Sequence, residues 1–330
     1  MKRTLTMLFI GALALGACNS DARNGDGPLI VYSGRSEELV KPLIDQFEES
    51  TGIEVEVRYA GSTELAATLL AEGESTDADV FFAQDPASLG SVKGILIELS
   101  PDILDQVDER FADSDGKWIG VSGRVRVFVH DAETTKTLPQ SIDDVVENPE
   151  WVGDLGVAPT NGSFLAFVAA MVLERGEDAT LEWLEKLAAA QPTYYEGNSP
   201  IVAAVDSGEI GAGLVNHYYL LQQRAEGAGA GAENWFIPAG DVGSLVMPAG
   251  AGIIAGTDHP VAAQQFVTFL LSEQAQEYFV SETFEYSLTG LPANPDLPDI
   301  ADIQSPDIDL SRLAETLATA TRLIAEAGLV

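Results

Sequence analysis

The sequence predicts an α/β protein built from two lobes, and three observations support this fold class. Short β-prone runs alternate with amphipathic helical segments from residue 28 onward, which is typical of a mostly parallel sheet covered by helices. About 300 residues follow this point, which is more than a single hydrophobic core usually serves. Hydrophobic residues make up 46% of the chain and aromatic residues 8%, so each lobe can bury a core of its own.

Residues 1–27 are expected to lie outside the two lobes. A Met-Lys-Arg start precedes an apolar run over 5–17, which is the order found in a secretory signal, and the run is too short to cross a bilayer of about 30 Å. Cys18, the only cysteine, follows Leu-Gly-Ala and resembles the lipobox at which bacterial lipoproteins are cut and acylated. We therefore assign 1–17 to a lipoprotein signal peptide and 18–27 to a polar tether. An ordinary signal peptide with an incidental cysteine is the alternative.

The first lobe is predicted to start as a β-α-β-α-β unit. Residues 29–32 are apolar and β-prone, and after Ser36 apolar residues recur at helical spacing. Residues 53–57 alternate as a half-buried strand does, 63–71 have a helical pattern, and 78–82 form a continuous apolar run. This order implies a mostly parallel sheet.

A second α/β lobe is predicted by the same alternation further along the chain. Its strands are expected near 125–129 and 156–158, and its helices over 163–174 and 181–190. After these we expect, in chain order, strands at 235–238 and 252–255, a helix over 261–271 and a final helix over 310–324.

Each lobe is predicted to be discontinuous in sequence, because the later elements carry the chain back to the first lobe. We assign the N-terminal lobe to 28–125 plus about 249–295, and the C-terminal lobe to about 126–248 plus the C-terminal helix at 305–330. Crossings of this kind make a hinge, with a ligand cleft between the lobes.

Composition argues against several classes of function. The formal net charge of -35 leaves no basic footprint for nucleic acid or for an anionic membrane surface. The sequence has no nucleophile-elbow, zinc-protease or P-loop motif. A glycosidase needs a pair of carboxylates, but 52 acidic residues produce such pairs by chance, so their presence does not indicate this activity. We therefore predict that the protein is not an enzyme, with an exported hydrolase using acidic residues as a remote alternative.

Tyr218 and Tyr219 are the most distinctive local feature, since they follow a short apolar strand at the start of a predicted helix. Adjacent side chains diverge within a strand or a helix, so both could contact one ligand only at a strand-to-helix turn. Two phenolates offer hard anionic oxygens suited to Fe³⁺, whose charge would overcome a phenol pKa of about 10. The alternative is that one tyrosine packs in the core and the other lies on the cleft.

Five segments in the same order resemble those of the bacterial ferric-iron-binding proteins of ABC transporters, within extracellular solute-binding family 1. The resemblance spans nearly the whole chain after the signal and implies a periplasmic-binding-protein-like fold (type II), with a hinge and an interlobe ligand cleft. The segments are Tyr-Ser-Gly-Arg at 32–35, Ala-Asp-Val-Phe-Phe at 78–82, Val-Ser-Gly-Arg at 121–124, Ala-Pro-Thr-Asn-Gly-Ser-Phe at 158–164 and Asn-His-Tyr-Tyr at 216–219.

The resemblance also implies roles for individual residues. Tyr218 and Tyr219 match the phenolate ligands of the metal. A synergistic anion, phosphate or carbonate, would lie beside the metal, and Ser163 would open a helix whose free N–H groups attract it. Arg124 matches an arginine near that anion, with a surface ion pair as the alternative. The other residues that match the anion site are Gly162, Asn198 and Asn216.

The first lobe departs from the family pattern. Well-known members have a histidine after the first strand and a glutamate after the third, and this chain has Ser36 and Gln84 at those places. Neither is a strong anionic ligand. Asp85 could substitute as a carboxylate or could instead cap the helix that follows. Together with Arg35, these three residues are the predicted first-lobe contacts.

Two kinds of cargo are compatible with the sequence. The resemblance implies a substrate-binding lipoprotein that binds ferric iron with its anion and passes it to an ABC permease and ATPase. The missing histidine and glutamate favour the alternative that the same fold binds a small organic solute such as a phosphonate, a polyamine or a thiamine-like molecule. In either case we expect a monomer that contacts the membrane only through its lipid, on the outer face of the cell membrane or in the periplasm.

Overall fold

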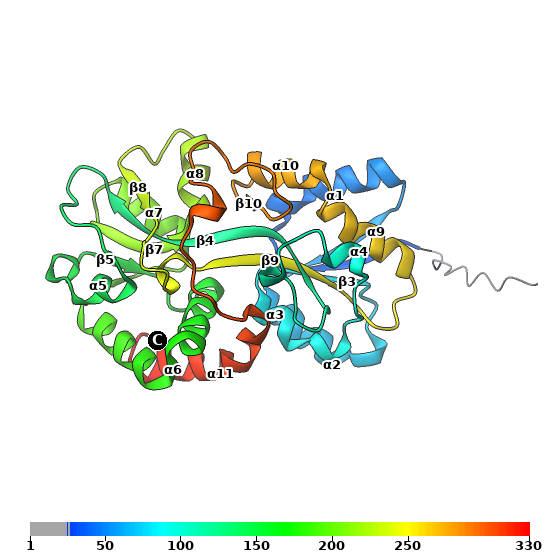
Figure 1. Ribbon diagram of the computed structural model, residues 1–330, viewed down its shortest axis with the longest axis horizontal. Coiled ribbons are helices and arrows are strands. Elements are labelled where there is room, and N and C mark those ends of the chain that lie inside the picture. The colour runs from blue at the N-terminus through cyan, green and yellow to red at the C-terminus, as the bar shows by residue number, and fades with distance from the viewer. Residues whose placement is uncertain (1–24, 26) are drawn as a thin grey trace, which may run out of the picture.

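The computed structural model describes Gly25 and residues 27–330, so Cys18 and the predicted signal peptide lie outside the described residues. Two α/β lobes lie side by side along the long axis of the molecule, and one twisted sheet runs through both (Figure 1). The strand order is β2-β1-β3-β9-β4-β7-β5-β6, and β8 and β10 also pair with β4. The predicted two-lobed α/β fold class is confirmed.

The N-terminal lobe begins with the predicted β-α-β-α-β unit. Its first strand lies between the second and the third and is parallel to both. The first helix buries Val40, Leu43, Ile44 and Phe47 on one face, which is the helical spacing read from the sequence. The elements are β1 (Leu29–Ser33), α1 (Glu37–Thr51), β2 (Val55–Tyr59), α2 (Ser62–Glu72) and β3 (Val80–Ala83).

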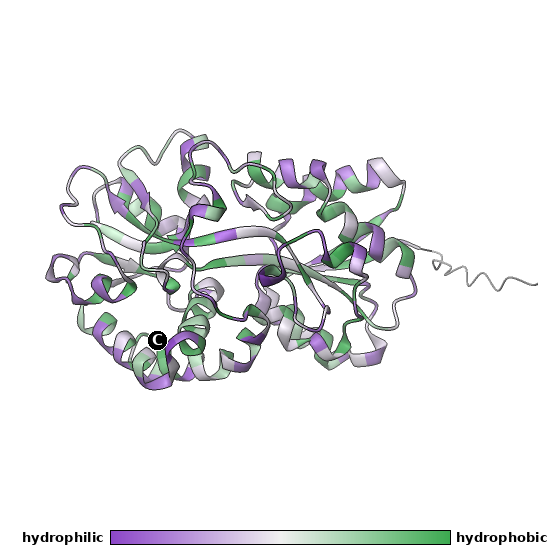
Figure 2. Ribbon diagram, viewed as in Figure 1, coloured by the Kyte–Doolittle hydropathy of each residue, from purple (hydrophilic) through white to green (hydrophobic). Residues whose placement is uncertain are grey.

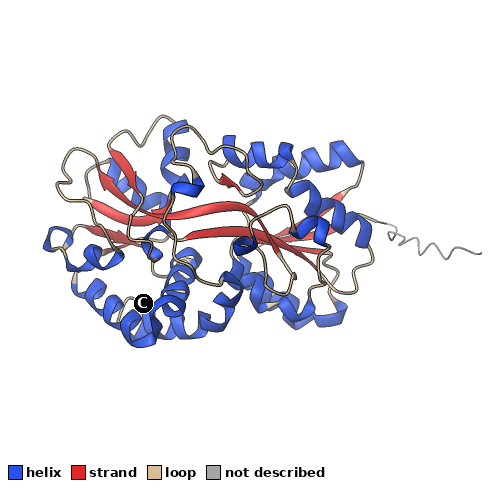
Figure 3. Ribbon diagram, in the orientation of Figure 1, coloured by secondary structure: helices blue, strands red, loops and turns tan. Residues whose placement is uncertain are grey.

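Two long antiparallel strands, β4 (Ile119–Asp131) and β9 (Val246–Ile253), cross between the lobes (Figure 3). The sequence predicted only a part of each, because their glycines and polar residues obscure the strand pattern. Those small residues permit close contact between strands: a Cβ added at Gly250 would lie 2.6 Å from the carbonyl oxygen of Ile119. The predicted lobe boundaries therefore fall within or beside continuous strands rather than in linkers.

The C-terminal lobe packs helices around the far end of the same sheet. The two helices predicted over 163–190 are the two halves of α6 and meet at Gly176, whose φ of 83° and ψ of 171° are not helical. The strand predicted at 235–238 was placed too late, since the residues that pair with β4 end at Trp235 and the apolar run after it contains Pro238, which has no N–H to donate. The elements are α5 (Ile142–Glu147), β5 (Leu155–Val157), α6 (Gly162–Ala189), β6 (Thr193–Tyr194), α7 (Asn198–Asp206), β7 (Ala212–Asn216), α8 (Tyr218–Ala225) and β8 (Ala232–Trp235).

The last helix, α11 (Leu313–Glu326), packs against α6 of the C-terminal lobe and also against α3 (Pro86–Ser91) of the N-terminal lobe. In Figure 1 it lies beside both helices on one side of the sheet. It therefore contacts both lobes. The remaining elements are α4 (Pro101–Leu104), α9 (Pro260–Leu270), α10 (Glu273–Ser281) and β10 (Tyr286–Ser287), with one-turn 3₁₀ helices at Gly73–Ser75, Lys93–Ile95, Glu109–Phe111, Pro149–Trp151, Val242–Ser244, Ile300–Asp302 and Leu310–Arg312.

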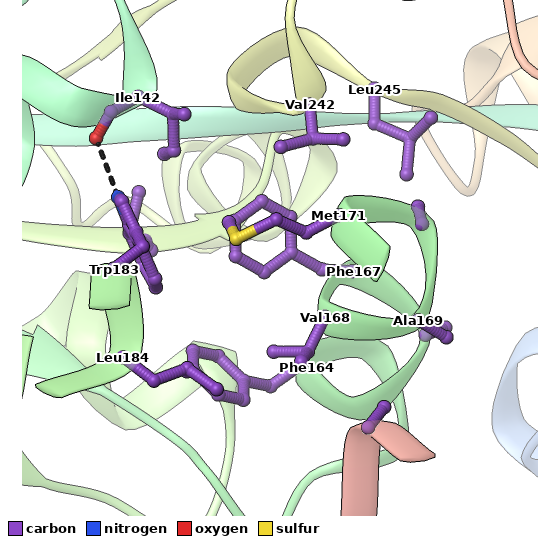
Figure 4. Close-up of a cluster of buried hydrophobic side chains, with 14 of the residues drawn as sticks. Ile142, Phe164, Phe167, Val168, Ala169, Met171, Trp183, Leu184, Val242 and Leu245 are labelled. Atoms are coloured by element: carbon purple, nitrogen blue, oxygen red, sulfur yellow. Dashed lines mark hydrogen bonds between the residues drawn. The ribbon is translucent and has the colours of Figure 1, made fainter. Parts of the chain in front are cut away.

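Each lobe has its own buried apolar cluster, and polar residues predominate on the outer faces of the helices (Figure 2). In the C-terminal lobe, Phe164, Phe167 and Trp183 pack together beneath the sheet, and the Trp183 indole donates a 3.0 Å hydrogen bond to the Ile142 carbonyl (Figure 4). Across the described part of the chain, no helix is both long and apolar enough to cross a membrane.

We expect Phe167→Ala to destabilise the protein by about 3–5 kcal/mol, the usual cost of removing a buried aromatic ring and leaving a cavity. Phe167 is 1% exposed, and its ring lies 5.8 Å from that of Trp183. Chemical denaturation measures the free energy of unfolding. Leu70→Ala is the control, because Leu70 is 54% exposed, and it should change little. Equal effects of the two substitutions would contradict this assignment of the core.

Candidate functional site

The tyrosine pair lies at the turn between β7 and α8. β7 ends at Asn216, His217 precedes the first helical residue, and α8 starts at Tyr218. The turn stacks the two rings, with centroids 4.3 Å apart and an interplanar angle of 29°. Tyr218 is 1% exposed, whereas Tyr219 is only partly buried. The strand-to-helix turn required for both side chains to contact one ligand is therefore present.

An open cleft of about 800 Å³ lies in front of the tyrosines and is lined from both lobes. Tyr218 and Tyr219 line it from the second lobe. Arg35, Ser36 and Gln84 line it from the first lobe, so the structure brings these three predicted first-lobe residues to the same cleft as the tyrosines. Ser36 and Gln84 offer only neutral oxygens and an amide.

The Tyr219 phenol keeps its proton when no ligand is bound, because its pKa is raised. Burial raises the pKa of Tyr219 well above its ordinary value, and the adjacent Tyr218 raises it further by charge and hydrogen bonding. Arg124 and Arg35 act in the opposite direction but do not cancel the effect. A ligand that coordinates the Tyr219 oxygen must therefore displace its proton, which requires a strongly charged cation.

A second, narrower cavity lies next to the cleft and shares Gln84 with it. It begins where α6 begins, and the Asn161 side chain caps that helix by accepting hydrogen bonds from the Ser163 N–H (2.9 Å) and hydroxyl (2.7 Å). The start of a helix favours an anion. The residues that line the cavity are Gln84, Asp85, Arg124, Arg126, Gly162, Ser163, Phe167, Asn216, Leu245 and Met247.

Two buried arginines, Arg124 and Arg126, give this cavity positive charge, and neither forms an ion pair within the described part of the chain. Arg124 donates to the Gln84 carbonyl. Arg126 makes long hydrogen bonds of 3.5 Å to Ser163 and Asn198, and its guanidinium lies 5.1 Å from the centre of the Phe167 ring. Among the described residues, neither Nε atom has a hydrogen-bond partner. Burial lowers the pKa of Arg126 to about 9, with Tyr219 and Tyr218 opposing that change, so the guanidinium is still charged at neutral pH.

Arg126 is the site residue that sequence reasoning missed. Residues 124 and 126 stand two apart on β4 and so point to the same side of the strand. Two arginines at that spacing inside an otherwise apolar strand were the available signal. The free volume of the cavity that both arginines line is about 20 Å³, on the order of one water molecule. An anion larger than a water molecule therefore needs the lining of this cavity to move apart.

The two asparagines have different positions. Asn216 lines the narrow cavity. Asn198 lies behind it, where its side-chain oxygen accepts a 2.9 Å hydrogen bond from the Asn216 N–H and its amide donates to the Ser163 hydroxyl at 3.2 Å. Asn198 thus holds two walls of the cavity in place.

Arg35 and Asp85 have strong partners of their own. Arg35 forms a bidentate ion pair with Glu285, with distances of 2.9 and 2.8 Å, and both side chains are buried. Asp85 caps α3 by accepting hydrogen bonds from the Ser88 N–H at 2.8 Å and hydroxyl at 3.0 Å. It lines the narrow cavity but not the cleft beside the tyrosines.

Within the part of the chain that the structure describes, no cluster of three or more His, Cys, Asp or Glu side chains could hold a metal ion. Glu37, Glu38 and Glu226 also line the cleft but form no such cluster, so the phenol oxygens of Tyr218 and Tyr219 are the paired donors available to a metal there.

A family model described as bacterial extracellular solute-binding protein matches residues 42–308. The Fe(3+)-binding periplasmic protein of Serratia marcescens is 33% identical over 96% of this chain and 94% of its own length. The major ferric iron-binding protein of Neisseria meningitidis serogroup B is 32% identical, over 91% of this chain and 93% of its own.

A solved structure agrees with these relatives. Iron-bound HitA from Pseudomonas aeruginosa matches with a TM-score of 0.84 and 31% identity, over 91% of this chain and 99% of that chain. The resemblance to ferric-iron-binding proteins that the sequence indicated is thus confirmed, and these relatives are solute-binding proteins rather than enzymes. The chain belongs to the bacterial extracellular solute-binding protein family.

Proposed function

We propose that this protein binds ferric iron in the cleft between its lobes and delivers it to the permease of an ABC importer. The observation that carries the proposal is the stacked pair Tyr218 and Tyr219 at the edge of a cleft lined from both lobes. Two adjacent phenolate oxygens are hard anionic donors, which favour a small trivalent cation. The names of the Serratia and Neisseria relatives support the same cargo.

We further propose that an anion, phosphate or carbonate, completes the site. Two phenolates balance only two of the three charges on ferric iron, and Arg124 and Arg126 add positive charge nearby. Burying such an excess of charge is unfavourable unless it is paired. The narrow cavity, with two arginines and the start of α6, is the natural place for that anion. Gly162, Ser163 and Asn216 would contact it there, and Asn198 would support it.

In this proposal the first lobe supplies no strong metal ligand, unlike the first lobe of the well-known members of the family. Ser36 and Gln84 are neutral, so we infer that they close over the bound ion and contribute weak or water-mediated contacts. Ligand bound between two lobes favours the closed arrangement of the hinge strands β4 and β9. Release to the permease requires reopening.

Anchoring through Cys18 is part of the proposal. A lipid at this residue would hold the protein near the permease and ATPase, on the outer face of the cell membrane or in the periplasm, and would raise its effective concentration there. We propose that the protein acts as a monomer.

The second candidate cargo is an organic anion such as a phosphonate. It is favoured by the neutral Ser36 and Gln84, and by the charged arginine pair, which could hold an acidic headgroup directly. The same positive charge disfavours a polyamine. In this case the tyrosines would stack or donate hydrogen bonds without losing their protons.

Metal analysis distinguishes these candidates. Purified protein is stripped of metal, incubated with a weak ferric chelate plus phosphate, bicarbonate or neither, and desalted. We expect one iron per chain, with retention increased by one of the two anions and one phosphorus per iron if that anion is phosphate. Failure to retain iron under all three conditions, together with a rise in melting temperature on adding a phosphonate, would favour the organic cargo.

A further inference from the structure

His217, the residue before the tyrosine pair, is buried and hydrogen-bonded through its side chain. Its side chain is fully buried, and both ring nitrogens are engaged. Nδ1 lies 3.1 Å from the N–H of Val125, and Nε2 lies 2.8 Å from the carbonyl oxygen of Phe284. The first partner can only donate and the second can only accept. The imidazole is therefore neutral, with its proton on Nε2.

The surroundings of the ring fix its orientation. The Tyr286 ring lies 4.9 Å away and the Tyr218 ring 5.8 Å away, the latter edge-on. The His217 carbonyl accepts a 2.8 Å hydrogen bond from the side chain of Asn234. His217, which precedes the first residue of α8, is thus held through both its ring and its backbone.

The partner of Nε2 belongs to a segment that the first lobe holds. Phe284 has a φ of +58°, which is unusual for a side chain other than glycine and has to be held by its neighbours. The next residue, Glu285, forms the bidentate ion pair with Arg35 and accepts a 3.0 Å hydrogen bond from Thr283. Arg35 itself lines the cleft in front of the tyrosines. A continuous chain of contacts therefore runs from the first-lobe wall of the cleft to the residue that precedes Tyr218.

We propose that His217 is a positioning residue, which fixes the direction of the tyrosine pair at the start of α8 through its hydrogen bond to Phe284 and the Arg35–Glu285 pair behind it. This inference rests on the proposed function, in that the tyrosines hold the cargo. Replacing a residue that orients a metal-binding side chain leaves that side chain in place but typically weakens metal affinity by about 10–100-fold.

Two substitutions separate the two hydrogen bonds of His217. His217→Gln places an amide where Nε2 lies and can keep the bond to Phe284. His217→Asn places its oxygen where Nδ1 lies and keeps the acceptor for Val125, but it is too short to reach Phe284. We expect His217→Asn to release iron to a chelator at least about 10-fold faster than the wild type, with a shifted phenolate–iron absorption band, and His217→Gln to stay within about 3-fold.

Amide hydrogen exchange in the iron-free protein tests the same inference without cargo. The backbone amides of residues 218–221 should exchange faster in His217→Asn than in His217→Gln. Equal exchange in both variants and the wild type, with equal iron release, would overturn the inference.

Absence of an iron band in the wild type would instead overturn the proposed function, and the exchange comparison would still decide the positioning role. If His217→Asn does not fold, Thr283→Val, which removes a hydrogen bond to Glu285, should speed iron release in its place, and an unchanged rate would overturn the inference.

Discussion

Tyr218→Phe and Tyr219→Phe should each weaken ferric binding by more than about 100-fold. Losing a residue that only supports a metal ligand typically costs about 10–100-fold in affinity, and the loss of a direct ligand should cost more. The substitution removes one oxygen and keeps the ring, so the 4.3 Å stacking of the pair and the fold should persist. Affinity is measured by competition with a chelator of known strength.

The matched control for the tyrosine variants is Tyr194→Phe. Tyr194 is 51% exposed and lies on β6, outside the residues that line the cleft and the narrow cavity. It should bind iron as the wild type does. If Tyr218→Phe and Tyr219→Phe also bound iron as tightly as the wild type, the tyrosines would not be ligands.

Glu285→Gln should destabilise the protein by about 3–5 kcal/mol, the usual cost of leaving one partner of a buried ion pair without the other. Arg35 and Glu285 have side-chain exposures of only 1% and 0%, so water cannot replace the missing charge. Chemical denaturation at neutral pH gives the measurement. Asp45→Asn is the control, because the Lys41–Asp45 pair is exposed and its loss should have no measurable effect on unfolding.

The same ion pair predicts a dependence of stability on pH. Burial by itself would raise the pKa of Glu285, but the charge and hydrogen bonds of Arg35 outweigh it and lower the pKa below its ordinary value. A carboxylate with a lowered pKa in the folded state contributes stability that is fully present above its unfolded pKa of about 4.3, and that is lost as the pH falls through the folded value. Glu285→Gln should therefore lose less stability than the wild type below about pH 4. Parallel losses in the two proteins would contradict this role of the pair.

The local pattern of the sequence predicted much of the fold. The β-α-β-α-β unit over 29–83 obeys the two periodicities of strand and helix, and the tyrosine pair was recognised because a strand-to-helix turn is a local feature. The hinge strands β4 and β9 were underestimated. Their glycines serve contacts with neighbouring strands, such as that of Gly250 with Ile119, and these contacts are not encoded in local periodicity.

The parts of the site that escaped prediction depend on residues far apart in the chain. Glu285 lies 250 positions from Arg35, and Phe284 lies 67 positions from His217, so no local pattern could pair them. Arg126 was overlooked because a charged residue in an apolar strand gains a function only when a cavity faces it. Asp85 could be given either of two roles from the sequence, and the structure shows it capping α3.

Visible absorption on adding ferric salt to the metal-free wild-type protein, with phosphate or bicarbonate present, tests the central claim most directly. Phenolate oxygens bound to ferric iron give a charge-transfer band that neither free iron nor protonated tyrosine gives. We expect this band to saturate at one iron per chain in the wild type and to be lost or greatly reduced in Tyr218→Phe and Tyr219→Phe. A wild-type protein that shows no band with either anion would contradict the assignment of ferric iron as the cargo.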